Sequence, residues 1–436
     1  MVADADVGSR LVAMEPVSER VDLPARLAGR ALLDVDVATR APATRIAARA
    51  LRDAAATLRP YRVAILVYLG TRALLLVIAI VNTALRHHPI LLQVTNWDGR
   101  WYRALAEAGY PAHVSHAQST LGFFPLYPIV VWLVAHLFYW PASDSFGWAI
   151  VCAGVTVSTL GGLMATVLAQ KLASGWWGEA AGRRAAVLFC LFPGSVVFSM
   201  VYAEGILIPL AIAVILALER ERWLLAGVLA GFATATEPEA VVLVLACATA
   251  SARELRRRGW RAAAWRRSLL APVLSLAGVA AFAAFLWAWT GTPFANLIAQ
   301  RDGWGEKTDP LALAHLASML GSEISFAHFN HPTINLNLVV GLAGAVVLFV
   351  MLALVFKSRR EISPAAIIWT LGISVVALTA VYPFSANPRV VITAFPAVLV
   401  LGRYVRGRAW SVLAWANGAS LAGMSALTFV GVTLRP

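Results

Sequence analysis

The chain has 436 residues, of which 60% are hydrophobic and 14% are charged, and its mean hydropathy is +0.72. A soluble protein of this length needs far more polar surface, so the composition predicts that most of the chain faces lipid. The net charge of +13 comes from arginines in short blocks between apolar runs. Membrane topology and anionic lipids explain such blocks better than nucleic acid does, so we expect no nucleic-acid partner.

Residues 1–60 form a polar leader with nine arginines and eight acidic residues, which we interpret as a cytoplasmic tail. It shows no cleavable signal peptide, because the first apolar run begins only near Tyr61. Residues 61–436 are expected to form a single transmembrane domain. The three cysteines lie inside apolar runs without metal-ligand spacing, so we predict neither a disulfide nor a metal centre.

Apolar runs recur along residues 61–436, with Trp and Tyr near many of their ends and arginines just beyond. This pattern is typical of a polytopic helical membrane protein, whereas barrel strands alternate over short segments. We predict an all-α bundle of about 11–12 apolar helices, some of them short or re-entrant because they are shorter than the ~20 residues of a perpendicular span. The runs cover residues 62–85, 123–140, 146–171, 185–203, 205–219, 223–236, 238–251, 269–290, 336–356, 363–383, 390–404 and 410–432.

Arginine and lysine placement predicts the topology of a multi-pass protein of the plasma membrane with a cytoplasmic N-terminus. Long loops at 86–122 and 291–335 then lie outside, with the turns around Glu204, Glu237 and Arg389. The predicted cytoplasmic basic blocks are residues 183–184, 220–222, 253–267, 357–360 and 403–408.

One stretch does not fit this topology. Two apolar runs separate the outer loop at 86–122 from the inner block at 183–184, where an odd number of crossings is needed. Pro125 and Pro128 disfavour a regular helix at the start of run 123–140, so we predict that this run is re-entrant. The alternative is that the 183–184 block lies outside, which inverts everything downstream.

The first outer loop contains a polar, aromatic stretch that reads as an interfacial helix. In helical register Asp98 and Tyr102 share one side, while Trp97 and Trp101 form an adjoining apolar side. We predict that the tryptophans enter the lipid boundary and that Asp98 lies at the helix start. A carboxylate there either caps the helix or faces a substrate.

Two arginines bear on that choice. Arg100 and Arg103 bring cations to the end of the helix where a structural cap prefers anions. A carboxylate with two nearby guanidinium groups is better suited to an anionic substrate, which favours a binding role for this stretch.

Other polar side chains follow the ends of later apolar runs. Glu237 sits beside Pro238, where it is either a helix-start carboxylate or a contact to substrate. Arg389 at a helix start opposes the helix dipole, so an anionic partner explains it better than capping does. The remaining candidate contacts are Tyr202, Glu204, Gln300, Trp304 and the pair His328 and His331, which alone is a weak metal signal.

These side chains include no nucleophile–base pair, phosphate-binding glycine loop or zinc signature. One carboxylate with arginines suits group transfer from a lipid phosphate. The phosphate is already a good leaving group, so one general base and stabilising cations suffice, and no cofactor is needed.

Ordered motifs in this chain resemble the PIG-V family, which comprises GPI mannosyltransferase 2-like enzymes of the GT-C superfold and their bacterial relatives. The resemblance covers roughly residues 96 to 396, and where relatives commonly show an arginine and a glycine this chain has Glu237 and Ala240. The matching residues are Asn96-Trp97-Asp98-Gly99, Tyr102, Ala108-Gly109-Tyr110, Phe123 to Pro128, Pro193-Gly194-Ser195, Phe198, Tyr202-Ala203-Glu204, Ala233 to Thr236, Gln300, Trp304, Pro388-Arg389 and Phe395-Pro396.

The resemblance implies an inverting α-mannosyltransferase that takes mannose from a polyprenyl-phosphate mannose donor on the outer face. The acceptor would be a hydroxyl of a glycolipid, glycan or protein. Asp98 matches the family's catalytic base, and Arg389, Arg100 or Arg103, helped by His328 or His331, would hold the phosphate. The alternatives are a transporter or flippase of lipid-linked sugars, a GT-C enzyme for another polyprenyl-phosphate sugar, and an inactive relative that binds partners.

Overall fold

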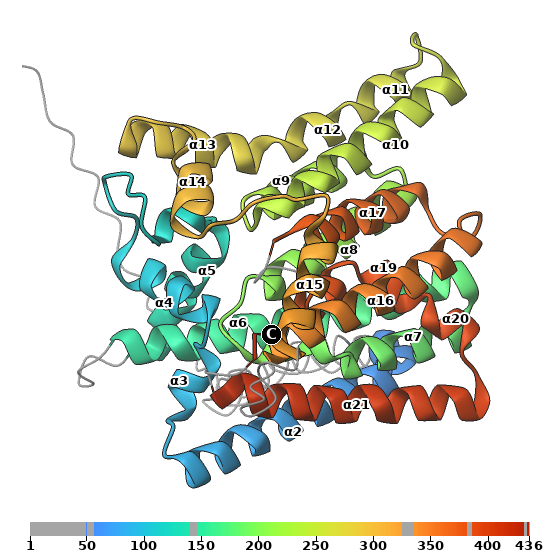
Figure 1. The fold of residues 1–436 in the computed structure, drawn as a ribbon. Coiled ribbons are helices and arrows are strands. Elements are labelled where there is room, and N and C mark those ends of the chain that lie inside the picture. The colour runs from blue at the N-terminus through green and yellow to red at the C-terminus, as the bar shows by residue number, and fades with distance from the viewer. Residues whose placement is uncertain are drawn as a thin grey trace, which may run out of the picture. The chain divides into compact units, whose positions relative to one another are not determined.

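The computed structural model describes residues 49, 56–139, 146–324, 335–381, 386–430 and 434–435. The chain divides after Pro60 into two units, and the helices from α2 onwards belong to the second one (Figure 1). The described part is nearly all helical, and its only extended pairing is an isolated bridge between Thr308 and Ala380. The predicted all-α class is therefore confirmed.

The helices follow the apolar runs of the sequence closely. The first half contains α2 (Arg62–Arg86), α3 (Ile90–Val94), α4 (Asp98–Ala108), α5 (Leu126–Phe138), α6 (Phe146–Trp177), α7 (Glu179–Leu191), η3 (Pro193–Ser199), α8 (Glu204–Glu219), α9 (Trp223–Thr234), η4 (Pro238–Val241) and α10 (Val242–Arg258). The second half contains α11 (Ala263–Ser268), α12 (Leu270–Ser275), α13 (Ala277–Thr290), α14 (Ala295–Ile298), η5 (Ala299–Gly303), α15 (Ala312–Ile324), α16 (Leu336–Lys357), α17 (Pro364–Thr379), α18 (Pro388–Thr393), α19 (Phe395–Leu399), α20 (Leu401–Tyr404) and α21 (Gly407–Val430). Two short 3-10 turns, η1 (Arg59–Tyr61) and η2 (Thr120–Gly122), complete the described elements.

Five of the helical stretches in the described part are long and apolar enough to cross a membrane. A sixth crossing results if α7 and η3, which meet at a bend of 71°, form one broken span. The chain is therefore a multi-pass membrane protein. The five stretches are Ala56–Arg86, Phe146–Trp177, Ala263–Thr290, Leu336–Lys357 and Gly407–Val430.

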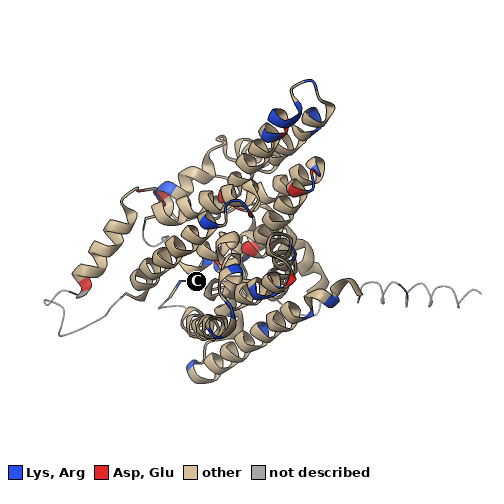
Figure 2. Ribbon diagram, turned by 90° about the vertical axis from the view of Figure 1, so that its right-hand side faces the viewer, with Lys and Arg blue, Asp and Glu red and all other residues tan. Residues whose placement is uncertain are grey.

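The basic blocks of the sequence meet at one end of the bundle, which we call the basic end. There Arg184 donates to the carbonyl of Gly402 at 3.0 Å, and Arg403 pairs with Glu361 at 3.1 Å. Lysines and arginines also gather at the tip of the α10–α11 hairpin (Figure 2). The helix α8 begins at Glu204, and α10 begins shortly after Glu237. Both helices run from these acids to the basic end.

The α5–α6 hairpin contains the two apolar runs that separate the loop at 86–122 from the basic block at 183–184. Tyr127, near the start of α5, donates to the carbonyl of Gly154 at 3.1 Å, while His136 near its end packs on Phe146 at 5.3 Å between ring centroids. The two helices are therefore antiparallel, and α5 has only 13 residues. Only α6 continues to the basic end, where Trp176 donates to Glu219 at 2.9 Å.

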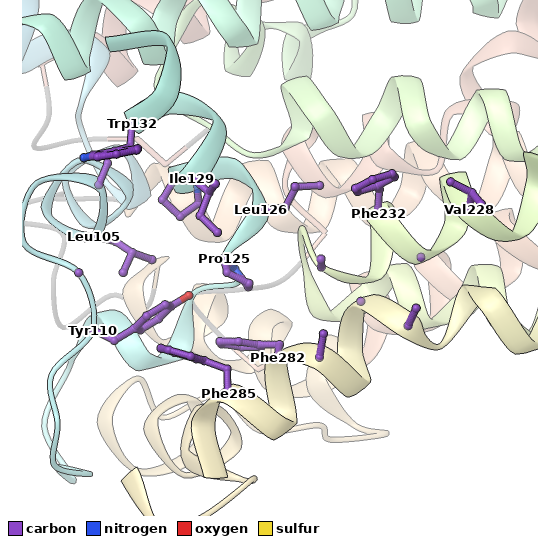
Figure 3. A pocket seen from close by; sticks show the side chains of 18 of the residues that line it. Leu105, Tyr110, Pro125, Leu126, Ile129, Trp132, Val228, Phe232, Phe282 and Phe285 are labelled. Atoms are coloured by element: carbon purple, nitrogen blue, oxygen red, sulfur yellow. The ribbon is translucent and has the colours of Figure 1, made fainter. Parts of the chain in front are cut away.

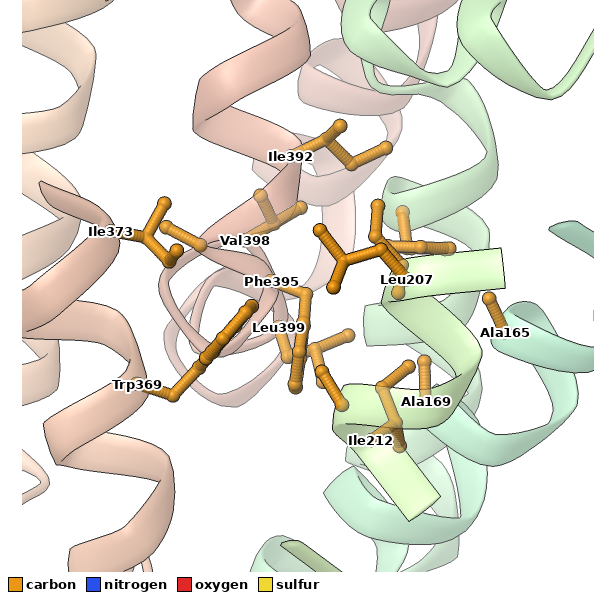
Figure 4. Close-up of a cluster of buried hydrophobic side chains, with 14 of the residues drawn as sticks. Ala165, Ala169, Leu207, Ile212, Trp369, Ile373, Ile392, Phe395, Val398 and Leu399 are labelled. Carbon is orange, nitrogen blue, oxygen red and sulfur yellow. The ribbon is translucent and has the colours of Figure 1, made fainter. Parts of the chain in front are cut away.

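The largest apolar core fixes α8 against the α18–α19 segment. Leu207 and Ile212 of α8 face Phe395 and Leu399 of α19, with Trp369 of α17 beside them (Figure 4). The helix α8 is apolar on all sides and almost fully buried, as expected for the centre of a bundle. This packing sets the relative position of the first residues of α8 and α18, which carry Glu204 and Arg389.

Candidate active site

The helix α4 begins at Asp98 after an unusual backbone turn. Trp97, its N-cap residue, has a φ of +59°, a left-handed conformation that is uncommon for a bulky residue. The side-chain amide of Asn96 donates to the carbonyls of Thr428 and Phe429 in α21, both at 3.1 Å, which holds this turn in place. Such backbone strain is typical of functional sites, where surrounding contacts maintain it.

The carboxylate of Asp98 is used in an ion pair and not as a helix cap. No side-chain cap hydrogen bond forms at the α4 N-cap, and Asp98 instead accepts from Nη1 of Arg389. The backbone N–H of Asp98 donates to the hydroxyl of Tyr202 at 3.2 Å. Asp98 is thus held by two segments that lie far from it in the sequence.

Arg389 is the centre of the cluster, and each of its guanidinium nitrogens faces a carboxylate. Nε donates to Glu204, Nη1 donates to Asp98, and Nη2 lies 3.7 Å from Oε1 of Glu237. The guanidinium also lies over the ring of Tyr202, 4.9 Å from its centroid. Three carboxylates therefore share one cation, so Arg389 organises acids in this structure and has no side free for an anion.

A close approach between η3 and α18 sets the position of Arg389. A Cβ atom on Gly194 would overlap the carbonyl oxygen of Pro388, the residue directly before Arg389. Glycine is therefore required at this position for the two segments to touch. Asn387 caps α18 by accepting from the N–H of Val390 at 3.1 Å.

Glu237 is buried, with 4% of its surface exposed. Its Oε1 accepts from the hydroxyl of Tyr102 at 3.0 Å, while Oε2 has no hydrogen-bond partner among the described residues. Burial, followed by the charges of Glu239 and Glu204, raises the pKa of the Glu237 carboxyl well above its usual range, although Arg389 opposes the shift. The side chain therefore favours its neutral form while this site is empty of a cation.

A polar cavity of about 150 Å³ opens beside the cluster. Asp98, Glu237 and Arg389 line it together with Glu239, the acid on the other side of Pro238 from Glu237, and with Glu306, which the sequence did not single out. Glu306 is exposed, and the charges of Glu239 and Asp98 raise the pKa of its carboxyl in addition to the surrounding protein. The sequence signal for Glu306 was weak, since it is one charged residue in a polar loop. The cavity also contains Tyr102, Phe123, Phe124, Gln300 and Trp304.

A second small cavity, of about 130 Å³, lies on the other side of Asp98 and is cationic. Arg100 and Arg435 line it, and neither forms an ion pair with a residue in the described ranges. The guanidinium of Arg435 lies 4.7 Å from the ring centroid of Trp97. Arg435 was not predicted, because it is over 300 positions from Asp98 in sequence and follows the last apolar run. The other lining residues are Trp101, Gln118 and Trp304.

An apolar cavity of about 840 Å³ lies next to the same helix, between α4 and α5 on one side and α9, α12 and α13 on the other (Figure 3). Leu105 and Tyr110 border it near α4, Pro125 directly precedes α5, Ile129 lies on α5, and Phe282 lies on α13. Pro125 follows Phe124 in the sequence, and Leu105 lies three residues after Tyr102 on α4. Phe124 and Tyr102 line the polar cavity. The large apolar space and the acidic space are therefore adjacent.

Some predicted contacts lie elsewhere. Arg103 forms an ion pair with Glu107 at 2.7 Å and is not brought to Asp98. Both tryptophans of this stretch have partners inside the protein, since Trp101 packs on Trp304 with ring centroids 4.9 Å apart and Trp97 packs against the main core. Contact of these partly buried rings with the lipid boundary stays a prediction. His328 and His331 lie outside the described residues.

The remaining predicted residues border the site as structural contacts. Gln300 donates to the carbonyl of Gly122 at 3.1 Å, which ties η5 to η2. Trp304 packs edge-on against Phe123 at 5.6 Å between ring centroids and separates the two small cavities. No group of three or more potential metal ligands is arranged to hold an ion in the part of the chain that the structure describes.

Comparison with known proteins identifies the segment that carries most of this site. Residues 69–253 match the family model described as Mannosyltransferase (PIG-V). This segment includes Asp98, Tyr202, Glu204 and Glu237. Over this segment, which is less than half of the chain, the sequence is similar to the PIG-V family. No curated protein sequence matches it.

Solved structures extend the comparison to the fold of the chain. The apo oligosaccharyltransferase of Archaeoglobus fulgidus shares 15% identity, with a TM-score of 0.50, and the match covers 86% of this chain and 56% of that one. ArnT from Cupriavidus metallidurans, bound to undecaprenyl phosphate, gives 16% identity and a TM-score of 0.47 over 79% of this chain and 61% of ArnT. The chain thus spans less than two thirds of the length of either structure.

The first of these likenesses shows the GT-C glycosyltransferase fold. The family match and the membrane-spanning helices are two further features that the chain shares with membrane glycosyltransferases.

Proposed function

We propose that this protein transfers mannose from polyprenyl-phosphate mannose to an acceptor hydroxyl, with Asp98 as the general base. The observation that carries the proposal is the position of Asp98, which lines both the acidic cavity and the cationic cavity. A base for glycosyl transfer must reach the attacking hydroxyl next to the sugar-phosphate bond, and a carboxylate between two such cavities meets that requirement. The mannosyltransferase family match supports the choice of sugar.

The transfer step balances with one base and one leaving group. The acceptor O–H gives its proton to Asp98 while its oxygen forms a bond to the anomeric carbon, and the bond from that carbon to the phosphate oxygen breaks. The phosphate leaves with the electron pair, and attack from the opposite side inverts a β-linked donor to an α-mannoside. Arg389 orients the Asp98 carboxylate through their ion pair.

The donor phosphate is proposed to bind in the cationic cavity. Arg100 and Arg435 have no carboxylate partner in the described ranges, whereas the nitrogens of Arg389 all face acids. Guanidinium groups suit phosphate oxygens because they present several N–H donors in a plane. The hydrocarbon chain of a lipid-linked substrate would occupy the apolar cavity, whose lining is dominated by apolar and aromatic side chains.

The orientation in the membrane is part of the same proposal. Arginine-rich segments favour the cytoplasmic side, and the basic blocks meet at the end of the bundle away from Asp98. The active site would accordingly face outwards from the plasma membrane, where lipid-linked sugars rather than nucleotide sugars serve as donors.

Donor consumption tests the proposed function. Purified protein in lipid nanodiscs is incubated with radiolabelled polyprenyl-phosphate mannose and a panel of hydroxyl acceptors, and free polyprenyl phosphate and mannosylated product are measured. Formation of both in equal amounts is expected. Movement of intact donor across a vesicle membrane without product would contradict the proposal and indicate a transporter, and use of another polyprenyl-phosphate sugar would change the donor.

A further inference from the structure

The first apolar run contains an arginine that the proposed transfer step leaves unused. Arg72 lies on α2, within a stretch that is long and apolar enough to cross the membrane. At a rise of about 1.5 Å per residue, it is about 15 Å or more from either end of the helix. A charge at that depth is costly, and a protein that keeps one there usually uses it.

Arg72 directs most of its N–H donors to η3. Nη1 donates to the carbonyl of Ser195 at 2.7 Å and to the hydroxyl of Ser199 at 2.9 Å, and Nη2 donates to the hydroxyl of Ser195 at 3.1 Å. The adjacent Thr71 hydroxyl accepts the rest, and the guanidinium lies 4.9 Å from the ring centroid of Tyr68. Within the described ranges every acceptor of Arg72 is a neutral oxygen, so this cation serves no ion pair there.

The segment that Arg72 holds is the break in a span. The turn η3 meets α7 at an angle of 71°, and Pro193 is its first residue. Such a break leaves helix-end carbonyls without their usual partners, and Ser195 satisfies one of them by donating to the carbonyl of Cys190 at 2.7 Å. Because Arg72 donates to the same serine, it fixes the direction in which η3 leaves the helix.

The start of η3 is also the point that touches α18. Gly194, directly before Ser195, packs so closely on Pro388 that a Cβ atom would overlap the proline carbonyl oxygen. Arg389 is the next residue. Arg72 therefore holds, through one short segment, the contact that sets the position of Arg389.

The end of η3 leads to a second contact of the site. Three residues beyond it, the hydroxyl of Tyr202 accepts from the backbone N–H of Asp98 at 3.2 Å, and the guanidinium of Arg389 lies over the tyrosine ring. Arg72 itself is not among the lining residues of the apolar, acidic or cationic cavity. Any effect of Arg72 on transfer is thus carried by η3 and not by contact with a substrate in these cavities.

We propose that Arg72 is a positioning residue for glycosyl transfer, which holds the broken span so that η3 keeps Arg389 and Tyr202 against Asp98. This inference rests on the proposed function, because it takes Asp98 as the base. An arginine suits the task because its planar group presents five donors in a fixed geometry and can hold three oxygens at once. The cationic cavity, where the donor phosphate is proposed to bind, contains no residue of η3, so loss of Arg72 should affect kcat and not donor binding.

Arg72→Met and Arg72→Lys test the proposal, with Arg86→Met as the control because it makes the same change at an exposed residue of the same helix. We measure kcat and KM for polyprenyl-phosphate mannose in nanodiscs. Donor-binding sites are counted by equilibrium dialysis, and kcat is expressed per site so that unfolded protein does not contribute. Arg72→Met should lower kcat at least tenfold with KM within threefold of wild type, and Arg72→Lys should recover part of the loss. A kcat within threefold of wild type, or a rise in KM alone, would overturn the inference.

Two further variants test the route through η3. If Arg72 and Gly194 act through the same segment, the loss in the double variant Arg72→Met with Gly194→Ala should stay within about threefold of the larger single loss. Losses that multiply would contradict a shared route. Ser199→Ala removes one of the three contacts to η3 without removing the charge, and it serves if Arg72→Met fails to fold. It should lower kcat about three- to tenfold, and an unchanged kcat would count against the proposal.

Hydrogen exchange separates failure of the inference from failure of the proposed function, because it needs no turnover. In Arg72→Met the backbone amides of residues 194–204 and 390–393 should exchange at least tenfold faster than in wild type, while those of α13 should not change. This result supports the hold of Arg72 on η3 even if wild-type protein transfers no mannose, an outcome that would refute only the proposed function. Equal exchange of the two proteins in these segments would overturn the inference.

Discussion

Arg389 and Asp98 are 291 residues apart in the sequence and form an ion pair at the centre of the acidic cluster. The pair joins the first turn of α18 to the first residue of α4. It gives Asp98 a fixed orientation towards two small cavities of opposite charge. Preorganised charges of this kind lower the reorganisation needed when a proton moves to the base.

Replacing Asp98 with asparagine should remove the base while keeping the shape of the site. Because general-base catalysis typically contributes a factor of about 10²–10⁴, we expect kcat to fall by about that amount. Donor binding, measured by equilibrium dialysis with labelled donor, should be retained within a few-fold. Glu361→Gln is the matched control, and turnover of Asp98→Asn near the wild-type rate would refute the assignment.

Replacing Arg389 should destabilise the fold, because Asp98, Glu204 and Glu237 would then share no cation. Breaking a buried ion pair by removal of one partner costs about 3–5 kcal/mol. We expect Arg389→Gln to show a clearly lower thermal unfolding temperature in detergent. Arg389→Lys should lie between this variant and wild type, because one ammonium group cannot face three carboxylates in a plane. Unchanged unfolding of Arg389→Gln would show that the cluster adds nothing to stability.

Gly194→Ala tests how Arg389 is positioned. The added methyl group would overlap the carbonyl oxygen of Pro388 and push α18 away from η3. Transfer activity should fall at least tenfold with a modest loss of stability, since overpacking typically costs about 1–3 kcal/mol. Gly423→Ala in α21 is the matched control, because nothing lies within 4 Å of the new methyl group. Equal activities of the two variants would exclude a positioning role for this contact.

Filling the apolar cavity should raise KM for donors with a long isoprenoid chain more than KM for donors with a short one. Ala281→Trp places a large side chain among the residues that line it. We expect KM for a donor with a long isoprenoid chain to rise about tenfold, while a donor with a single short prenyl unit is little affected. Leu160→Trp on the exposed face of α6 controls for the added aromatic ring. Similar changes for long and short donors would show that the chain binds elsewhere.

Local properties of the sequence were enough to predict the helices and several members of the site. Apolar runs correspond to α2, α6, α16 and α21 because a segment in lipid must satisfy its own backbone hydrogen bonds and present apolar side chains throughout. Asp98 and Arg389 were noticeable because charged residues beside apolar runs are costly and therefore rare. Pro125 and Pro128 predicted an irregular start for run 123–140, and the helix begins only at Leu126 with Pro128 in its first turn; a re-entrant path for this run stays a prediction.

The tertiary structure decided which charges meet. The sequence suggested that Arg389 would hold a phosphate, yet helix packing surrounds it with carboxylates and leaves Arg100 beside the unpredicted Arg435. It likewise brings Glu306 from a distant loop to the cavity of Asp98. Ion pairing depends on distances of a few ångströms between segments hundreds of residues apart, and no local pattern contains that information. Helix formation is encoded locally in this protein, whereas the partner of each charge is set only when the bundle packs.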